Sequence, residues 1–304
     1  METTMTRVIH RMTTLLVTAL ALSGVGCTGS GATQHTDDGM PTNLDVTRHT
    51  DIAYYAGEDA VPGKHCLDVY QGAGVDGAPV LIYVHGGAWQ LGGKMFNQHI
   101  GRTFAKHGIV TVSVNYRLGG QARHPAQIRD VAWAFDWVTR NIHRYGGNPD
   151  DIFITGHSAG GHLVALLALN EKYLNEVGHA SHEITGVIPI GGIYRVGATS
   201  FIFEDTFDPS PESLIDASPE FHVDDDQPPF CIIYARDDLP LLDIQAIGLT
   251  RELQKHHSPV KLVRVEDRGH LTTFLKIGEK DDPTHAVMLD FIREHARSKL
   301  PWSR

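Results

Sequence analysis

Ser158 lies at the centre of the pentapeptide GHSAG, residues 156–160, which could hold a nucleophile. The pentapeptide follows a strand-like apolar run at 152–155 and opens a helix-like run at 161–170. A serine on such a sharp turn exposes its hydroxyl, and glycines two residues away on either side avoid a collision across the turn. The N-terminus of the following helix would stabilise negative charge that develops beside it. The pattern predicts a catalytic nucleophile, and the alternative is an N-capping serine in a glycine-rich turn.

A second glycine-rich segment, HGGAW at residues 85–89, follows the apolar run at 79–84. Glycines let a backbone approach a reacting group closely, so its N–H groups could stabilise an oxyanion. We predict donors at Gly86, Gly87 and Ala88, completed by the N–H of Ala159 next to the nucleophile. The alternative is a simple Gly-Gly turn after a strand. In the same segment we expect a structural role for the histidine, and either a core or a pocket-wall role for the tryptophan.

The elements that must position these segments alternate between strand and helix. Strand-like apolar runs occur at residues 79–84, 108–114, 152–155, 184–190, 230–235 and 260–265. Helical periodicity is clearest at 125–144, and a final helix is expected at 284–299. This alternation predicts an α/β fold with a mostly parallel sheet and helices on both faces. Residues 65–70 alternate apolar and polar side chains, which indicates an antiparallel edge strand.

One long segment, residues 191–228, shows no clear period and is rich in Pro, Ser and Asp. A long irregular segment inside a compact domain is usually functional. We expect it to form a short lid or pocket wall.

The first 27 residues read as an export signal. Two arginines precede an uncharged, mostly apolar stretch at 12–25, which is shorter than the ~20 residues that span a bilayer. The sequence GVGC ending at Cys27 resembles a bacterial lipoprotein signal, in which that cysteine is lipidated; ordinary cleavage nearby is the alternative. Residues 28–49 are predicted to be a flexible tether, and residues 50–304 the catalytic domain. We expect an exported protein, lipid-anchored in a bacterial envelope or secreted to the periplasm or beyond.

The composition argues against several other classes of protein and of site. The formal charge is −10, with 26 basic and 36 acidic residues, which argues against a nucleic-acid-binding surface. Nineteen histidines invite a metal site, but neither H-E-x-x-H nor C-x-x-C occurs. We expect no metal and no cofactor. Beyond Cys27 two cysteines remain, and we expect no disulfide between them.

The motifs HGGAW, NYRL (115–118), YGGNPDDI (145–152), GHSAGGH (156–162) and RGH (268–270) occur in this order. The chain thereby resembles the carboxylesterase-like α/β-hydrolases, including hormone-sensitive lipase-like esterases, over about residues 50–298. Its motifs are similar to those of two subgroups, the kynurenine formamidase type and the isoprenylcysteine methylesterase-like enzymes. Ala88 departs from the hormone-sensitive lipase-like pattern, which usually has a third glycine there. The long N-terminal helical cap of that group is also lacking.

The resemblance implies a triad in the order Ser, Asp, His. The acid belongs in the loop after the strand at 230–235, where Asp237 and Asp238 are adjacent; the usual position in related hydrolases favours Asp238. The base belongs after the last strand, where His270 follows a glycine. His270 would exchange the proton of Ser158, and Asp238 would orient the imidazole.

These inferences predict a serine hydrolase that cleaves small-molecule esters with small to medium acyl or alkyl groups. An amidase or formamidase with the same triad is the main alternative. A non-catalytic hydrolase fold that serves as a binding module is a second one. The oligomeric state is left open.

Overall fold

The structure is a computed structural model, and it describes residues 43–197 and 203–297 of the 304-residue chain. The described residues belong to one compact unit. The predicted signal at 1–27, with the lipidation site Cys27, lies outside the described residues. Within the described ranges, no helix is long and apolar enough to cross a membrane.

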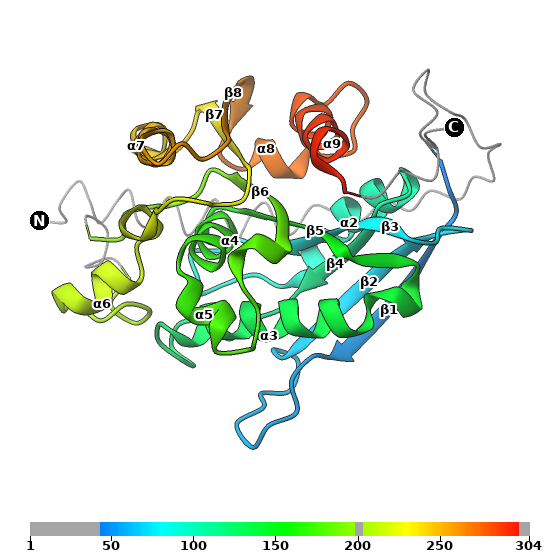
Figure 1. Ribbon diagram of the computed structural model, residues 1–304, viewed down its shortest axis with the longest axis horizontal. Coiled ribbons are helices and arrows are strands. Elements are labelled where there is room, and N and C mark those ends of the chain that lie inside the picture. Colours follow the sequence, from blue (N-terminus) through cyan, green and yellow to red (C-terminus); the bar gives the residue numbers. More distant parts are fainter. Residues whose placement is uncertain (1–42, 198–202, 298–304) are drawn as a thin grey trace, which may run out of the picture. The chain divides into compact units, whose positions relative to one another are not determined.

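The described residues form an eight-stranded sheet in the order β1-β2-β4-β3-β5-β6-β7-β8 (Figure 1). Strands β3 to β8 are parallel, and β1 and β2 are antiparallel to their neighbours. The strands are β1 (Val46–Ala53), β2 (Cys66–Gly72), β3 (Ala78–Val84), β4 (Val110–Val114), β5 (Gly147–His157), β6 (Ile184–Ile190), β7 (Phe230–Asp237) and β8 (Val260–Gly269). All six predicted apolar strands are therefore present, and the predicted α/β-hydrolase fold is confirmed.

The N-terminal edge of the sheet differs from the prediction in two ways. The antiparallel strand expected at 65–70 is β2, but it is not an edge strand, because β1 pairs along its outer side. Strand β1 begins at Val46, so the predicted tether at 28–49 cannot extend to residue 49. The sequence of β1 carries polar and half-exposed residues and has no continuous apolar run, which explains why it was not predicted.

Helices cover both faces of the sheet and bury alternate residues of each strand. Val80, Ile82 and Val84 of β3 belong to a core with α3, α4 and α7, whereas Leu81 and Tyr83 pack in a second core with α2 and α9. The helices are α2 (Gln98–Lys106), α3 (Ala126–Asn141), α4 (Ala159–Leu169), α5 (Glu171–Asn175), α6 (Pro211–Asp216), α7 (Leu242–Lys255), α8 (Thr272–Leu275) and α9 (Pro283–His295). The last of these ends before the predicted limit of residue 299.

The predicted lid, residues 191–228, contains only short helices in its described part: α6 and the 3-10 helix η5 (Pro219–His222). Asp216 anchors it to the domain, since its carboxylate accepts hydrogen bonds from His124 Nε2 (2.9 Å), Lys172 Nζ (3.0 Å) and the Tyr173 hydroxyl. Although burial alone would raise the pKa of Asp216, these donors lower it below its ordinary value, so the carboxylate stays ionised. The lid is thus fixed by a charged contact at α6.

Candidate active site

Ser158 occupies the turn between β5 and α4 and has φ 56° and ψ −116°, a left-handed conformation that few non-glycine residues adopt. The glycines on either side have no room for a side chain. A Cβ on Gly156 would lie 2.5 Å from the carbonyl carbon of Gly160, and a Cβ on Gly160 would lie 2.0 Å from the Val84 carbonyl oxygen. The backbone N–H of Ser158 donates to the Ile190 carbonyl at 2.8 Å. The turn is therefore held tightly between β3 and β6, as the glycine pattern predicts.

Asp238 and His270 lie at the carboxyl ends of β7 and β8 and contact each other. Nδ1 of His270 donates to Oδ1 of Asp238 at 2.6 Å. The carboxylate also accepts the backbone N–H groups of Ala235 (3.0 Å) and Leu239 (2.8 Å). Asp237 instead ends β7, pairs with Gly269 and is exposed. Of the two adjacent carboxylates, the structure brings Asp238 to the imidazole.

The Asp238 carboxylate is suited to hold a neutral or a charged imidazole. Burial alone would raise the pKa of this carboxyl, but the hydrogen bond and charge of His270 and two backbone donors lower it below its ordinary value. Because an ionised carboxylate only accepts hydrogen bonds, Nδ1 of His270 carries a proton, which leaves Nε2 to exchange one.

His270 is held next to the serine turn by the residue that precedes the nucleophile. Nε2 of His157 donates to the His270 carbonyl at 2.8 Å, and the two ring centroids lie 4.5 Å apart. Gly191, at the end of β6, faces the same imidazole, since a Cβ there would lie 3.2 Å from Nδ1 of His270. The ends of β5, β6, β7 and β8 therefore meet at one place.

The HGGAW segment follows β3 and passes beside the serine, since a Cβ on Gly86 would lie 3.3 Å from Cβ of Ser158. Its backbone is unusual, with φ of 121° at Gly87, 54° at Ala88 and 58° at Trp89. The described part of the chain offers no hydrogen-bond acceptor to the N–H groups of Gly87 and Ala88. These N–H groups are free to bind a ligand oxygen.

Ala159, the fourth predicted donor, is the first residue of α4. The N–H groups of a first helical turn have no partner within the helix. The predicted oxyanion donors thus come from two segments, one after β3 and one after β5, that flank Ser158.

Three histidines around the site are buried and uncharged. Burial lowers the pKa of His85 to about 4, and that of His157 and His162 to about 3. His85 stacks on Tyr116 with ring centroids 4.3 Å apart, in keeping with the structural role expected for it. His157 and His162 make directional hydrogen bonds to residues around the serine turn. Sequence patterns carry no signal for such tertiary contacts.

Trp89, whose role the sequence left open, is a buried aromatic with 1% of its surface exposed. Its ring meets two lid residues edge to face, with centroid distances of 5.2 Å to Phe203 and 4.8 Å to Phe207. Trp89 thus packs the HGGAW segment against the lid.

Among the described residues, no group of three or more His, Cys, Asp or Glu side chains could hold a metal ion. His179, for example, contacts Glu183 (2.7 Å) and Asp136 (3.0 Å). Cys66 and Cys231 are buried free thiols.

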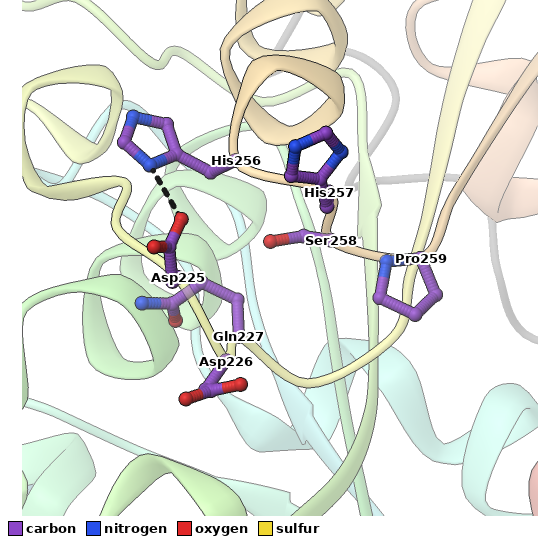
Figure 2. A pocket seen from close by; sticks show the side chains of 7 residues that line it. All are labelled: Asp225, Asp226, Gln227, His256, His257, Ser258 and Pro259. Atoms are coloured by element: carbon purple, nitrogen blue, oxygen red, sulfur yellow. Dashed lines mark hydrogen bonds and ion pairs between the residues drawn. The ribbon is translucent and has the colours of Figure 1, made fainter.

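A cavity of about 470 Å³ lies away from this site (Figure 2). It is lined by residues 225–227, just before β7, and 256–259, just before β8. Figure 2 shows His256 pointing toward Asp225, with their nearest atoms 3.1 Å apart. Because β7 and β8 are parallel, this cavity lies at their amino ends, whereas Asp238 and His270 lie at their carboxyl ends. The cavity is therefore separate from the candidate active site.

Comparisons with known proteins agree with this geometry. A family model described as BD-FAE matches residues 67–253. The chain is 32% identical over 209 residues to the probable carboxylic ester hydrolase LipM of Mycobacterium tuberculosis, covering 62% of this chain and 48% of that protein. It is 32% identical over 247 residues to esterase LipC of the same organism, covering 75% of this chain and 61% of that protein. The chain thus spans roughly half the length of the curated relatives it matches.

Among solved structures, a truncated carbohydrate esterase from gut microbiota superimposes with a TM-score of 0.69 at 25% identity. The match covers 86% of this chain and 98% of that one. The resemblance to carboxylesterase-like α/β-hydrolases, seen in the sequence motifs, is confirmed.

Proposed function

Because the chain belongs to the BD-FAE family and has the α/β-hydrolase fold, we propose that it hydrolyses carboxylic esters through an acyl-enzyme on Ser158. The observation that carries the proposal is the 2.6 Å hydrogen bond between Asp238 and His270 beside the strained serine turn. Relatives described as esterases or ester hydrolases support the same reaction class.

The mechanism follows from the positions of these groups. His270 Nε2 accepts the proton of Ser158 Oγ as this oxygen attacks the ester carbonyl carbon. The carbonyl oxygen becomes an oxyanion, which accepts hydrogen bonds from the N–H groups of Gly87, Ala88 and Ala159, with Gly86 beside them. The imidazolium then gives its proton to the departing alkoxide, which leaves as the alcohol. Water, deprotonated by the same imidazole, releases the carboxylic acid and restores the serine.

The substrate that we propose is a small or medium-sized apolar ester. Large apolar side chains that are exposed in the described part all lie on segments that follow the carboxyl ends of β3, β6, β7 and β8: Leu91, Met95, Phe96, Ile215, Phe221, Leu241, Ile244 and Leu275. These are the strand ends that carry the site. One domain with a short lid favours short chains over long triglycerides.

We also propose that the chain is exported and that Cys27 carries a lipid. The support is the sequence alone, with two arginines before a short apolar stretch and a small residue before the cysteine. Metabolic labelling with a palmitate analogue tests this proposal. Label should enter the full chain and be absent from a Cys27→Ser variant; label in both variants, or in neither, would contradict it.

Hydrolysis of p-nitrophenyl esters from acetate to palmitate, with N-formylkynurenine in parallel, tests the activity. Ester turnover should be highest at short chains and should be lost in Ser158→Ala. Turnover of the formyl amide alone would instead indicate a formamidase. Folded wild-type protein that turns over none of these substrates would contradict hydrolysis and favour a binding module.

A further inference from the structure

Trp89 and His162 form a buried hydrogen bond that joins the two motifs on which the proposed site depends. The indole Nε1–H of Trp89 donates to Nδ1 of His162 at 3.1 Å. The rings meet edge to face with centroids 5.1 Å apart, and the residues are 1% and 0% exposed. Trp89 ends the HGGAW segment, and His162 lies on the first turn of α4, where its backbone N–H donates to the Ser158 carbonyl at 3.0 Å.

The two neighbours of the His162 ring fix its protonation. An indole N–H can only donate, so Nδ1 must be an unprotonated acceptor. On the other side of the ring, Nε2 lies 2.7 Å from the Ala217 carbonyl oxygen, which can only accept, so Nε2 must carry the proton. Burial lowers the pKa of His162 to about 3, so this neutral form persists at neutral pH. The imidazole accepts from one partner and donates to the other.

The indole is the side chain of a segment whose backbone needs support. Ala88 and Trp89 both have positive φ, at 54° and 58°, and follow Gly87 at 121°. Non-glycine residues in this region persist only when surrounding contacts hold them there. The hydrogen bond from Trp89 to His162 holds this strained turn, which offers the N–H groups of Gly87 and Ala88, against the helix that begins beside the nucleophile.

The other partner of the imidazole belongs to the lid. Ala217 follows α6 directly and is fully buried. Phe207, also in the lid, packs edge to face on both rings, at 4.8 Å from Trp89 and 5.8 Å from His162. The His162 imidazole therefore connects the HGGAW segment, helix α4 and the lid.

We propose that His162 is a positioning residue for the oxyanion hole, acting through Trp89, and that it couples this segment to the lid. The inference rests on the proposed ester hydrolysis. A misplaced oxyanion donor weakens binding of the transition state more than binding of the substrate. Loss of the imidazole should therefore lower kcat and leave KM nearly unchanged, which distinguishes positioning from a general packing role.

The test uses the full chain, three single variants and the double variant His162→Phe/Trp89→Phe. His162→Phe keeps a ring and removes both nitrogens. Trp89→Phe replaces the indole by a smaller aromatic ring without a donor, and His162→Gln restores one acceptor and one donor. His285→Phe is the matched control, because His285 is a largely buried imidazole on α9 that packs on Phe104 (5.2 Å). Turnover of p-nitrophenyl butyrate is measured together with amide resonances of Gly87 and Ala88.

We expect kcat to fall about 100-fold in His162→Phe and about 10-fold in Trp89→Phe, with KM changed less than about 3-fold. The double variant should be no slower than His162→Phe, because both substitutions remove one shared contact. His162→Gln should recover part of the rate. The Gly87 and Ala88 resonances should shift in both single variants, and neither rate nor resonances should change in the control.

Wild-type kcat and unshifted amides in His162→Phe would overturn the inference, as would equal losses in the control. If His162→Phe does not fold, Trp89→Phe and His162→Gln decide by the same two measurements. If the wild-type protein hydrolyses no ester, the proposed function fails. The resonances of Gly87 and Ala88 then still decide whether His162 positions this segment.

Discussion

Nδ1 of His270 and Oδ1 of Asp238 lie 2.6 Å apart, in a contact that leaves 9% of the imidazole side chain and 3% of the carboxylate side chain exposed. The strand ladder explains why the second of two adjacent aspartates makes this contact. Asp237 still belongs to β7 and pairs with Gly269, and the chain then turns so that the next side chain points inward. The two carboxylates therefore face different environments although they are neighbours in sequence.

Asp238→Asn should lower kcat about 1,000- to 10,000-fold, because an amide cannot hold the imidazole with its proton on Nδ1. Asp237→Asn is the matched control and should change kcat less than about 2-fold, since this side chain is exposed. Steady-state turnover of p-nitrophenyl acetate measures both. A larger loss of kcat in Asp237→Asn than in Asp238→Asn would contradict the assignment of Asp238 as the acid of the triad.

The position of His270, and with it kcat, should also depend on two hydrogen bonds to the His270 backbone carbonyl. The His270 carbonyl accepts hydrogen bonds from His157 Nε2 (2.8 Å) and Thr273 Oγ1 (2.7 Å). His157→Phe keeps a ring against Phe274, whose centroid lies 4.4 Å away, and removes one donor. We expect each of His157→Phe and Thr273→Val to lower kcat about 10-fold, and the double variant to lose more.

The measurement is kcat and KM for one ester, with circular dichroism to show that each variant folds. If the double variant hydrolyses the ester as fast as the wild type, these contacts do not position His270.

Much of the site could be predicted because its chemistry imposes local patterns. The glycines around Ser158 are required by backbone contacts of 2.0 and 2.5 Å that any Cβ would make, and such constraints are visible in a single sequence. The buried strands appear as apolar runs because β3 and β6 are buried along their whole length. Local patterns thus identified the serine turn and the sheet that holds it.

Other features depend on contacts between distant segments, and the sequence could not reveal them. Only the resemblance to related hydrolases favoured Asp238 over Asp237, because the physical reason for that choice is where β7 ends against β8. The bond between Trp89 and His162 joins residues 73 positions apart. Strand β1 was missed because one of its sides faces solvent and its sequence is largely polar.

Gly160→Ala should abolish folding of the serine turn or unfold the protein, because its Cβ would lie 2.0 Å from the backbone oxygen of Val84. Gly248→Ala in α7 is the matched control, since the nearest atom to its Cβ would be 3.8 Å away, on Glu220. Alanine there should raise the free energy of unfolding by about 0.5–1 kcal/mol. Thermal unfolding and ester turnover compare the two. A Gly160→Ala protein with wild-type Tm and kcat would contradict the geometry of the turn.

Acid should destabilise the fold in a pH range set by buried imidazoles. Burial lowers the pKa from 6.5 to about 3 or 4 at four histidines: His85, His157, His162 and His285. Below pH 6.5 the unfolded chain binds protons that the folded chain does not, so the free energy of unfolding falls as pH decreases toward 4. Each imidazole contributes up to about 1.4 kcal/mol per pH unit. The carboxylates whose pKa is lowered act mainly below this range, since their ordinary values are 3.8 to 4.5.

His285→Phe isolates one of these contributions without touching the site. Because the variant lacks one titrating imidazole, the slope of its unfolding free energy against pH should be smaller by up to about 1.4 kcal/mol per unit between pH 6 and 4.5. Urea unfolding at several pH values measures both slopes. Parallel slopes for the wild type and the variant would mean that His285 is protonated equally in the folded and unfolded chains, and that its burial does not exclude the proton.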